Sequence, residues 1–332
     1  MRVVALEEHF TVPALVGRID PVILAKRGFP APGSNVGAAR QSDRLSEVGL
    51  VRINDMNDNG ITVQVLSVAG PGAELLSPPD SIVCAREFND TLSALIDCQK
   101  DRFAGFAHLP MTAPQGAAEE LERAVIDLGF CGAVVNGTTD GAFLDDPKFD
   151  TILEAAERLD VPIYLHPGIP PQTVRDAYYK GLPGSLSEML SMGGWGWHAE
   201  TAVHVLRLVL SGALDRHPRL KIIIGHMGEG LPGMLARSEQ VMGAESLRYL
   251  QRSISQTILD QVYVTTSGIF ALAPFLALLH TFGVDHIMFS VDYPFSPNSR
   301  GRAFLDSLPV APNDLKRIAH GNADQLLKLR TY

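Results

Sequence analysis

KIIIGHMG, at residues 221–228, is a lysine followed by a short β-branched apolar run that ends in polar and glycine residues. A continuous apolar run of this length is typical of a parallel strand buried on both faces. Seven further runs of this kind are spread along the 332 residues: VVALEE (3–8), VQVLSVA (63–69), FAGFAHL (103–109), GAVVNG (132–137), VPIYLHPG (161–168), QVYVTTSG (261–268) and HIMFSVDYP (286–294). The sequence therefore predicts eight strands.

The regions between these strands carry helical patterns, of which the clearest are 81–99, 114–129 and 149–160. Eight alternating strands and helices predict an α/β fold, a (β/α)8 TIM barrel, in a single domain over residues 1–332. A doubly wound sheet is the alternative, but no glycine-rich phosphate loop follows the first strand. The stretch 312–330 is expected to form a final helix pair that closes the barrel.

Two segments are too long and irregular for simple connections. Residues 10–45 are rich in proline and glycine, with FPAPGSN near the middle, and residues 167–198 contain PGIPP, YYKGLPG and GGWGW. Both follow the carboxyl ends of predicted strands, which is the face where barrel enzymes carry their sites. Long loops in compact domains are often lids or binding loops, so we expect both segments to shape a site at the C-terminal face.

Composition excludes several classes of function. The chain is 46% hydrophobic with a net charge of −9 and no basic cluster, which is typical of a soluble globular protein and argues against a nucleic-acid partner. No apolar stretch reaches the length of about 18 residues that a membrane span needs, and the N-terminus lacks a signal-peptide pattern. The three cysteines, Cys84, Cys98 and Cys131, are widely spaced and suit reduced thiols, so we expect a cytoplasmic protein.

Charged side chains stand where several predicted strands end. Residues i and i+2 of a strand share a face, so Glu7 and His9 point the same way and Glu8 points to the other face. Taken singly, a strand-end histidine is more often structural than a metal ligand. Glu7, His9, His166 and Asp292 are expected at one level of one barrel, however, and together they suit a divalent metal such as Zn²⁺ or Mn²⁺.

The other histidines follow a different pattern. His108 ends the third predicted strand, but it precedes Leu-Pro and is interpreted as structural. His204, His217, His280 and His320 lie in helical or connecting stretches and are interpreted as structural or surface residues. The metal prediction therefore rests on the strand-end residues alone.

These motifs, in this order, resemble the amidohydrolase-related decarboxylases, the family of γ-resorcylate and 2,3-dihydroxybenzoate decarboxylases. The resemblance runs nearly end to end. Its motifs are ALEEHF (5–10), RINDMNDNGITVQVLSV (52–68), REFNDTL (86–92), DRFAGFAHLPM (101–111), GAVVNG (132–137), YLHPGIPP (164–171), the stretch 195–232, TTSGIF (265–270) and FSVDYPF (289–295). It implies a TIM barrel, a homodimer or homotetramer, and one divalent metal per chain, Zn²⁺ or Mn²⁺, with Mg²⁺ as a further candidate.

The resemblance also implies roles for individual residues. The metal ligands of the family match Glu7, His9, His166 and Asp292, the catalytic pair beside the metal matches His226 and Glu229, and the substrate-contacting asparagine matches Asn136. The fourth strand has no lysine that could bridge two metals, so one metal is expected.

Two segments depart from the family pattern, namely 10–45 and GMLARSEQVM (233–242). Arg237 keeps its place, but Glu239 and Gln240 replace an acid–histidine pair, and Gly233 removes bulk. These segments are expected to shape the substrate pocket, so they bear on which acid is bound.

The leading functional hypothesis is non-oxidative decarboxylation of a hydroxylated aromatic acid such as an ortho-hydroxybenzoate. Asp292 would deliver a proton to the carbon that bears the carboxylate, with His226 and Glu229 holding that proton in place. Arg237 is a candidate anion clamp, although a long arginine on a helix more often makes a surface ion pair. The candidate aromatic wall of the pocket is formed by Trp195, Trp197, Tyr293 and Phe295, although single aromatic residues more often serve packing.

Two rival functions use the same scaffold. A metal-dependent hydrolase would attack a lactone, ester or amide, with Asp292 as general base. The glutamate of the first motif favours the decarboxylase, because many hydrolases of the superfamily carry His-x-His there. A barrel that has lost its activity is the second rival, and the intact set of candidate ligands argues against it.

Overall fold

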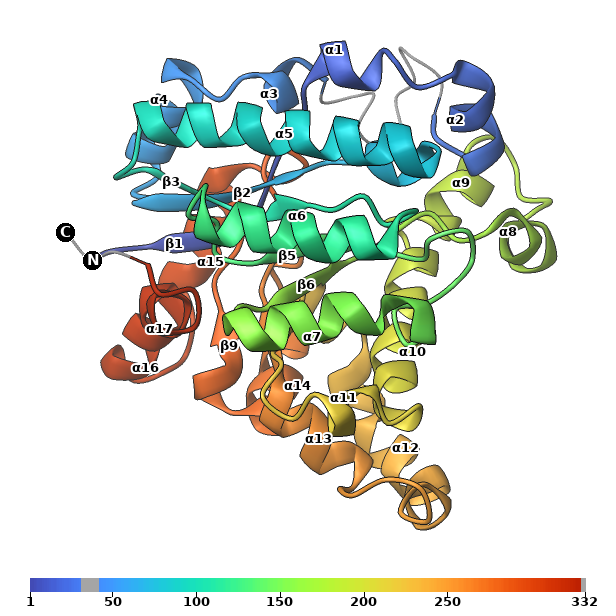
Figure 1. Cartoon of the computed structure of the whole chain (residues 1–332). Helices are drawn as coiled ribbons and strands as arrows, with labels where there is room; N and C mark the ends of the chain where they lie inside the picture. The colour runs from blue at the N-terminus through green and yellow to red at the C-terminus, as the bar shows by residue number, and fades with distance from the viewer. Residues whose placement is uncertain (31–41, 330–332) are drawn as a thin grey trace.

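The computed structural model describes residues 1–30 and 42–329, so part of the predicted FPAPGSN segment lies outside the described residues. The chain forms a barrel of parallel strands surrounded by helices, as Figure 1 shows, and the predicted TIM barrel is confirmed. Its strands are β1 (Val4–Phe10), β2 (Val63–Val68), β3 (Phe103–Gly105), β4 (Ala107–His108), β5 (Ala133–Asn136), β6 (Ile163–His166), β7 (Ile222–Ile224), β8 (Val262–Thr265) and β9 (Ile287–Met288). Every predicted strand region contains at least one of them.

β3 and β4 are the two parts of the third predicted strand. On one side Phe106 N donates to Leu66 O of β2 at 2.9 Å, and on the other Cys131 N donates to Gly105 O at 3.0 Å. The strand therefore joins the ladder β1–β2–β3 to the ladder β4–β5–β6–β7–β8–β9, and the parallel sheet is continuous.

Helices cover the outside of the barrel. The outer layer consists of α4 (Leu50–Asp58), α5 (Pro78–Cys98), α6 (Pro114–Ile126), α7 (Asp150–Leu159), α10 (Gly196–Leu210), α11 (Ala213–Arg216), α12 (Leu231–Ser246), α13 (Ile254–Gln261), α14 (Leu272–Phe282) and α15 (Asn298–Asp306). Their apolar faces pack against the outward-facing side chains of the strands and form the larger of two hydrophobic clusters.

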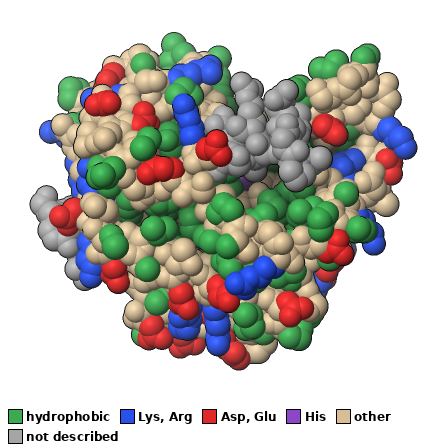
Figure 2. Space-filling view, turned by 90° about the horizontal axis from the view of Figure 1, so that it is seen from above, with side chains coloured by type: hydrophobic (Ala, Val, Ile, Leu, Met, Phe, Trp, Pro, Cys, Tyr) green, Lys and Arg blue, Asp and Glu red, His purple; other side chains and the backbone are tan. Residues whose placement is uncertain are grey.

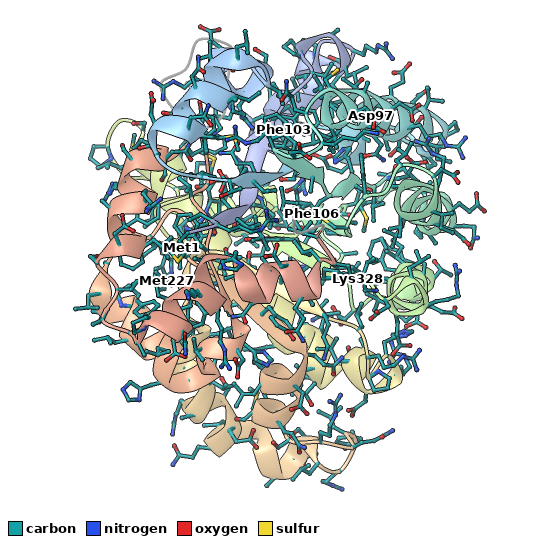
Figure 3. All side chains as sticks on the ribbon, turned by 90° about the vertical axis from the view of Figure 1, so that its left-hand side faces the viewer. Met1, Asp97, Phe103, Phe106, Met227 and Lys328 are labelled. Carbon is teal, nitrogen blue, oxygen red and sulfur yellow. The ribbon has the colours of Figure 1, made fainter. Side chains whose placement is uncertain are left out.

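The smaller cluster fills the inside of the barrel, with Leu6, Phe106 and Tyr164 among its largest members. Figure 3 labels Phe106 of this inner cluster and Phe103 of the outer one. The C-terminal stretch forms α16 (Pro312–Lys316), a π-helical turn and α17 (Asn322–Leu326), and Ala323 belongs to the inner cluster. The predicted closing helix pair thus packs against the barrel interior at the amino ends of the strands.

Both long segments carry short helices at the opposite, C-terminal face. Residues 10–45 contain α1 (Pro13–Val16), α2 (Pro21–Arg27) and the start of α3 (Ser42–Ser46), and residues 167–198 contain α8 (Gln172–Tyr178) and α9 (Leu186–Ser191). In Figure 1, α2, α8 and α9 lie on the right, whereas the N-terminus and α17 lie on the left. The predicted position is therefore confirmed for the described residues of both segments.

The last strand is much shorter than HIMFSVDYP predicted, because its ladder ends at Met288. Glu8 takes over the pairing: its carboxylate accepts hydrogen bonds from Val291 N at 2.8 Å and Tyr293 N at 3.0 Å. Glu8 is completely buried on the face away from the other charged residues of the first motif, as predicted, and burial raises its pKa to about 8. Beyond Met288, the Glu8 carboxylate and one backbone hydrogen bond, from His9 N to Tyr293 O at 2.7 Å, thus close the barrel.

Replacing Glu8 by alanine is expected to lower the free energy of unfolding by roughly 2–4 kcal/mol, since it leaves two buried backbone N–H groups without an acceptor. Chemical denaturation of the purified protein measures this change. Glu122→Ala is the matched control, because Glu122 pairs with Arg158 at 3.0 Å on the surface, and we expect its denaturation midpoint to stay close to that of the wild type. Equal denaturation midpoints for Glu8→Ala and Glu122→Ala would contradict the role of Glu8.

Among residues 1–30 and 42–329, no helix combines the length and the apolar character needed to cross a membrane. All three cysteines are free thiols, with Cys84 and Cys131 buried and Cys98 exposed.

Candidate active site

The charged strand-end side chains converge at the C-terminal end of the barrel. His166 Nε2 lies 3.3 Å from Glu7 Oε1, and His9 Nε2 lies 3.3 Å from Asp292 Oδ1. His226 joins both, with its Nε2 3.6 Å from Glu7 Oε1 and 3.8 Å from Asp292 Oδ2. The geometry thus brings together the four predicted ligands and the predicted catalytic histidine.

Glu7 uses its two carboxylate oxygens differently. Its Oε2 accepts hydrogen bonds from the hydroxyls of Tyr164 and Ser267, whereas its buried Oε1 has no hydrogen-bond partner. Burial alone would raise the pKa of Glu7, but the neighbouring imidazoles, His226 foremost, outweigh it and hold this pKa far below its usual range. Glu7 is therefore a fixed carboxylate with one oxygen left for a cation.

His9 is oriented in a similar way. Its Nδ1 lies 3.2 Å from Ser67 Oγ, while its buried Nε2 has no hydrogen-bond partner. A proton on Nδ1 that is donated to Ser67 leaves the Nε2 lone pair free, which is the tautomer a metal ligand needs. Burial is the main cause that lowers the pKa of His9, and a lower pKa favours the neutral ring.

The unpaired Glu7 Oε1 and His9 Nε2 indicate whether the site fits a metal ion. A buried carboxylate oxygen and a buried imidazole nitrogen without partners are costly unless a ligand satisfies them. Glu7, His9 and His166 can place one ligand atom each within 4.8 Å of one another, and so can Glu7, His226 and Asp292. Imidazole and carboxylate donors suit Zn²⁺ and Mn²⁺, so the residues present fit one divalent ion.

The backbone around these residues is unusual. His226 (φ +48°), Met227 (+57°), Glu229 (+57°) and Asp292 (+70°) all adopt positive φ without being glycine. His226, Met227 and Gly228 form a tight turn, η4, directly after β7, and Met227 is labelled in Figure 3. Such conformations are held only by their surroundings and cluster at functional sites.

Glu229 links two imidazoles behind the convergent residues. Its Oε1 lies 2.9 Å from His226 Nδ1, and its Oε2 lies 2.5 Å from His198 Nδ1. The indole of Trp197 donates to His198 Nε2 at 3.1 Å, so the proton of a neutral His198 lies on Nδ1 and is donated to Glu229. Burial would lower the pKa of His226, but the charges of Glu7 and Glu229 outweigh it and raise this pKa.

A cavity of about 870 Å³ opens above these residues. Asn136, Trp195, Trp197 and Phe295 line it, as predicted, and so do Phe29 and Met189 from the two long segments. Figure 2 shows a hollow in the middle of the face in view, with hydrophobic side chains around it. Gly233 also borders the cavity, where a Cβ would contact nothing within 4 Å, so the missing bulk there widens it.

Two predicted pocket residues lie elsewhere. Arg237 is exposed on α12 and donates to Gln240 Oε1 at 3.1 Å, because its long side chain extends into solvent rather than toward the cavity. Tyr293 is buried with its ring 4.8 Å from the Arg52 guanidinium, and its neighbour Asp292 faces the cavity instead. Neither side chain lines the cavity.

Sequence reasoning missed several residues that the structure places at the site. Tyr164 and Ser267 lie inside predicted strands. A polar side chain that faces inward from an otherwise apolar strand could have indicated them. His198 lies in the first turn of α10 and Glu74 in the short turn η2 (Ala73–Leu75), where the sequence pattern gives no direction for a side chain. Gly225 was also unmarked, yet a Cβ there would lie 2.3 Å from Glu7 Oε2, so only glycine leaves room for that carboxylate.

A parallel barrel that gathers carboxylates and imidazoles at the carboxyl ends of its strands defines the class of metal-dependent barrel enzymes. The family model described as Amidohydrolase matches residues 43–329. The chain belongs to this amidohydrolase family, in its group of decarboxylases.

Three known proteins illustrate this membership. The chain is 38% identical over 338 residues to decarboxylase orsB of Emericella nidulans, covering 98% of this chain and 96% of that protein. It is 36% identical over 340 residues to gamma-resorcylate decarboxylase of Rhodococcus jostii, covering 98% of each. A dihydroxybenzoic acid decarboxylase from Polaromonas sp. JS666, solved with manganese and the inhibitor 2-nitroresorcinol, superposes with a TM-score of 0.85 at 33% identity, covering all of this chain and 98% of that one.

Proposed function

We propose that the protein removes the carboxylate of an ortho-hydroxylated aromatic acid as CO₂, using one divalent ion held at the carboxyl ends of the strands. The observation that carries this proposal is the convergence of Glu7, His9, His166 and Asp292 around two buried polar atoms that have no protein partner. Manganese in the Polaromonas decarboxylase favours Mn²⁺ over Zn²⁺ here.

The four convergent side chains would hold the ion through two imidazoles and two carboxylates. Once bound, a divalent cation supplies positive charge that anchors a carboxylate and an adjacent phenolic oxygen and stabilises negative charge on them. Ser67, Tyr164 and Ser267 support the ligands from behind, and such second-shell contacts fix the orientation of metal ligands.

Asp292 is the proton donor in this proposal. Its carboxylic acid protonates the ring carbon that bears the carboxylate, the bond to that carboxylate breaks, its electron pair returns to the ring, and CO₂ leaves. In the free site, burial would raise the pKa of Asp292, but His226 and His9 outweigh it and lower this pKa. An anionic substrate placed beside Asp292 acts in the opposite direction and favours the protonated form that the step needs.

The proton that Asp292 gives up has to be replaced after each turnover. His226 Nε2 is 3.8 Å from Asp292 Oδ2, and Glu229 connects the far side of this imidazole to His198. His198 lies in the first turn of α10 and itself borders the cavity. This chain of imidazole, carboxylate and imidazole supports a relay that returns a proton to Asp292.

Elemental analysis of the purified protein, combined with a CO₂-release assay on ortho-hydroxybenzoates, tests the proposed function. We expect one Mn²⁺ or Zn²⁺ per chain and CO₂ in equal amount to the phenol formed. Addition of water to a lactone, ester or amide without CO₂ release would instead support a hydrolase. A protein without bound metal, and without affinity for added Mn²⁺ or Zn²⁺, would contradict the metal centre itself.

The homodimer or homotetramer stays a prediction from the resemblance. Light scattering after size-exclusion chromatography measures the mass of the assembly, and a single chain in solution would contradict it.

A further inference from the structure

A buried arginine outside the cavity contacts the segments that carry His9 and Asp292. Arg52 lies in the first turn of α4, is completely buried, and does not border the cavity. Its Nη2 donates a hydrogen bond to His9 O at 2.5 Å, and its guanidinium lies 4.8 Å from the centre of the Tyr293 ring. None of the steps above uses Arg52, so its place behind the metal centre calls for an explanation.

Stability alone does not explain an arginine at this position. Burial lowers the pKa of Arg52 to about 10, although nearby ionisable groups, Tyr293 and Glu8 foremost, oppose this, so the guanidinium stays charged at neutral pH. Its Nε and Nη1 have no hydrogen-bond partner among the described residues. Taking a charge out of water is costly, and buried N–H groups without acceptors add to that cost.

The contacts of Arg52 lie on two segments that meet at the metal site. His9 N donates to Tyr293 O at 2.7 Å and His9 O accepts from Arg52, so the backbone of His9 is held on both sides. The ring under the guanidinium belongs to Tyr293, which directly follows Asp292. On the cavity side, His9 Nε2 and Asp292 Oδ1 are 3.3 Å apart. Arg52 thus contacts the backbone behind the first of these groups and the neighbour of the second.

Regular strand pairing does not hold these two segments together. β1 forms its ladder with β2, whereas β9 ends at Met288, before the chain reaches Asp292. Asp292 has a φ of +70°, which a residue other than glycine keeps only where its surroundings enforce it. A hydrogen bond from a charged donor is stronger than a neutral one, and a guanidinium over an aromatic ring adds a cation–π attraction. Arg52 supplies both contacts at the place where the backbone ladder is missing.

Arg52 is itself fixed at the start of its helix. The carboxylate of Glu47 accepts hydrogen bonds from Gly49 N at 2.9 Å and from Arg52 N at 2.8 Å. Ile53 and Met56 of the same helix are buried in the outer hydrophobic cluster. The guanidinium is therefore attached to a rigid element.

We propose that Arg52 is a positioning residue that keeps the backbone of His9 and the segment Asp292–Tyr293 at one spacing. His9 then binds the metal while Asp292 faces the substrate carbon. The inference rests on the proposed function, because it concerns the geometry of that metal centre and that proton donor. Since Arg52 does not border the cavity, its loss should weaken metal binding and slow the proton transfer, whereas the affinity of the loaded enzyme for the acid should change little.

The test compares the wild type with Arg52→Met, which removes every donor, and with Arg52→Lys, which keeps a charged donor. Calorimetric titration of the metal-free proteins should show that Arg52→Met binds Mn²⁺ roughly 10- to 100-fold more weakly, the range for losing a contact behind a metal ligand. At saturating Mn²⁺ its kcat should fall roughly 10- to 100-fold while KM stays within about threefold of the wild type. Arg52→Lys should recover most of both losses.

Arg252→Met is the matched control. Arg252 is largely buried and also donates to a backbone carbonyl, Leu214 O at 3.0 Å, but it does not border the cavity. We expect wild-type Mn²⁺ affinity and kcat for this variant, whatever chemical denaturation shows for its stability. Wild-type affinity and kcat in Arg52→Met, or equal losses in Arg52→Met and Arg252→Met, would overturn the assignment of Arg52.

A second variant keeps the test decisive where Arg52→Met does not fold. Tyr293→Leu leaves Arg52 in place and removes the ring that joins it to the Asp292 segment. At saturating Mn²⁺ we expect kcat to fall about tenfold with KM within about threefold of the wild type. Wild-type kcat in Tyr293→Leu, together with wild-type Mn²⁺ affinity in Arg52→Lys, would then overturn the proposal.

The titration with Mn²⁺ separates this inference from the proposed function, because metal binding requires no turnover. If no acid releases CO₂ but Arg52→Met binds Mn²⁺ more weakly and Arg52→Lys restores the affinity, the decarboxylase fails and the positioning of His9 holds. If CO₂ is released and Arg52→Met keeps the wild-type affinity and kcat, only the role of Arg52 fails. A wild type that binds no Mn²⁺ overturns both.

Discussion

Asp292→Asn is expected to lower kcat by about a thousandfold or more while the protein keeps its fold and most of its metal. An asparagine side chain has the same shape and still offers an oxygen to a cation, but it has no acidic proton to give to the ring carbon. A positioned general acid contributes roughly 10²- to 10⁴-fold to a rate, and here the transferred proton is also the one that ends up in the product.

The measurement combines single-turnover CO₂ release with elemental analysis of the same sample, so that loss of the metal is not mistaken for loss of the proton donor. Asp306→Asn serves as the control, because Asp306 pairs with Arg302 at 2.9 Å on α15, away from the cavity. We expect wild-type turnover for that variant. Near-native turnover in Asp292→Asn would show that another group delivers the proton.

The general fold could be predicted because parallel strands that are buried on both faces have continuous apolar sequences. The end of the last strand could not, because the residues after Met288 look equally apolar and aromatic in HIMFSVDYP. Val291 N and Tyr293 N donate to the carboxylate of Glu8 instead of to a neighbouring strand, although Glu8 lies more than 280 positions away in the sequence. A local sequence pattern cannot indicate that a distant side chain, rather than a strand, will accept these hydrogen bonds.

The same distinction applies to the candidate site. Glu7, His9 and His166 could be placed together because each stands near the end of a strand. Glu7 and His9 reach the same site even though the register of β1 against β2 shifts between Ala5 and Glu8. His198 lies in the first turn of α10 and Glu74 in a short turn after β2, so their direction depends on where these turns begin, which the sequence does not specify. For Arg237 the sequence suggested a role that the structure does not support. The position in the motif suggested an anion clamp, but the side chain extends into solvent.

His166→Ala is expected to remove the metal rather than the proton donor. His166 Nε2 lies 3.3 Å from the unpaired oxygen of Glu7, and alanine leaves the site one imidazole short. Loss of a second-shell contact already costs metal sites 10- to 100-fold in affinity, so loss of a ligand should cost more than about a hundredfold. Turnover at limiting Mn²⁺ should fall in proportion to occupancy.

Thermal unfolding gives a readout of this variant that does not depend on activity. A cation that binds only the folded state raises Tm, so the wild type should unfold at a lower temperature after chelation, whereas His166→Ala should respond little to added or removed Mn²⁺. His280→Ala, at an exposed position on α14, should keep the full wild-type response. Stoichiometric metal in purified His166→Ala, with a wild-type shift of Tm on chelation, would show that β6 does not supply a ligand, and the metal centre would then have to be built from Glu7, His9, His226 and Asp292.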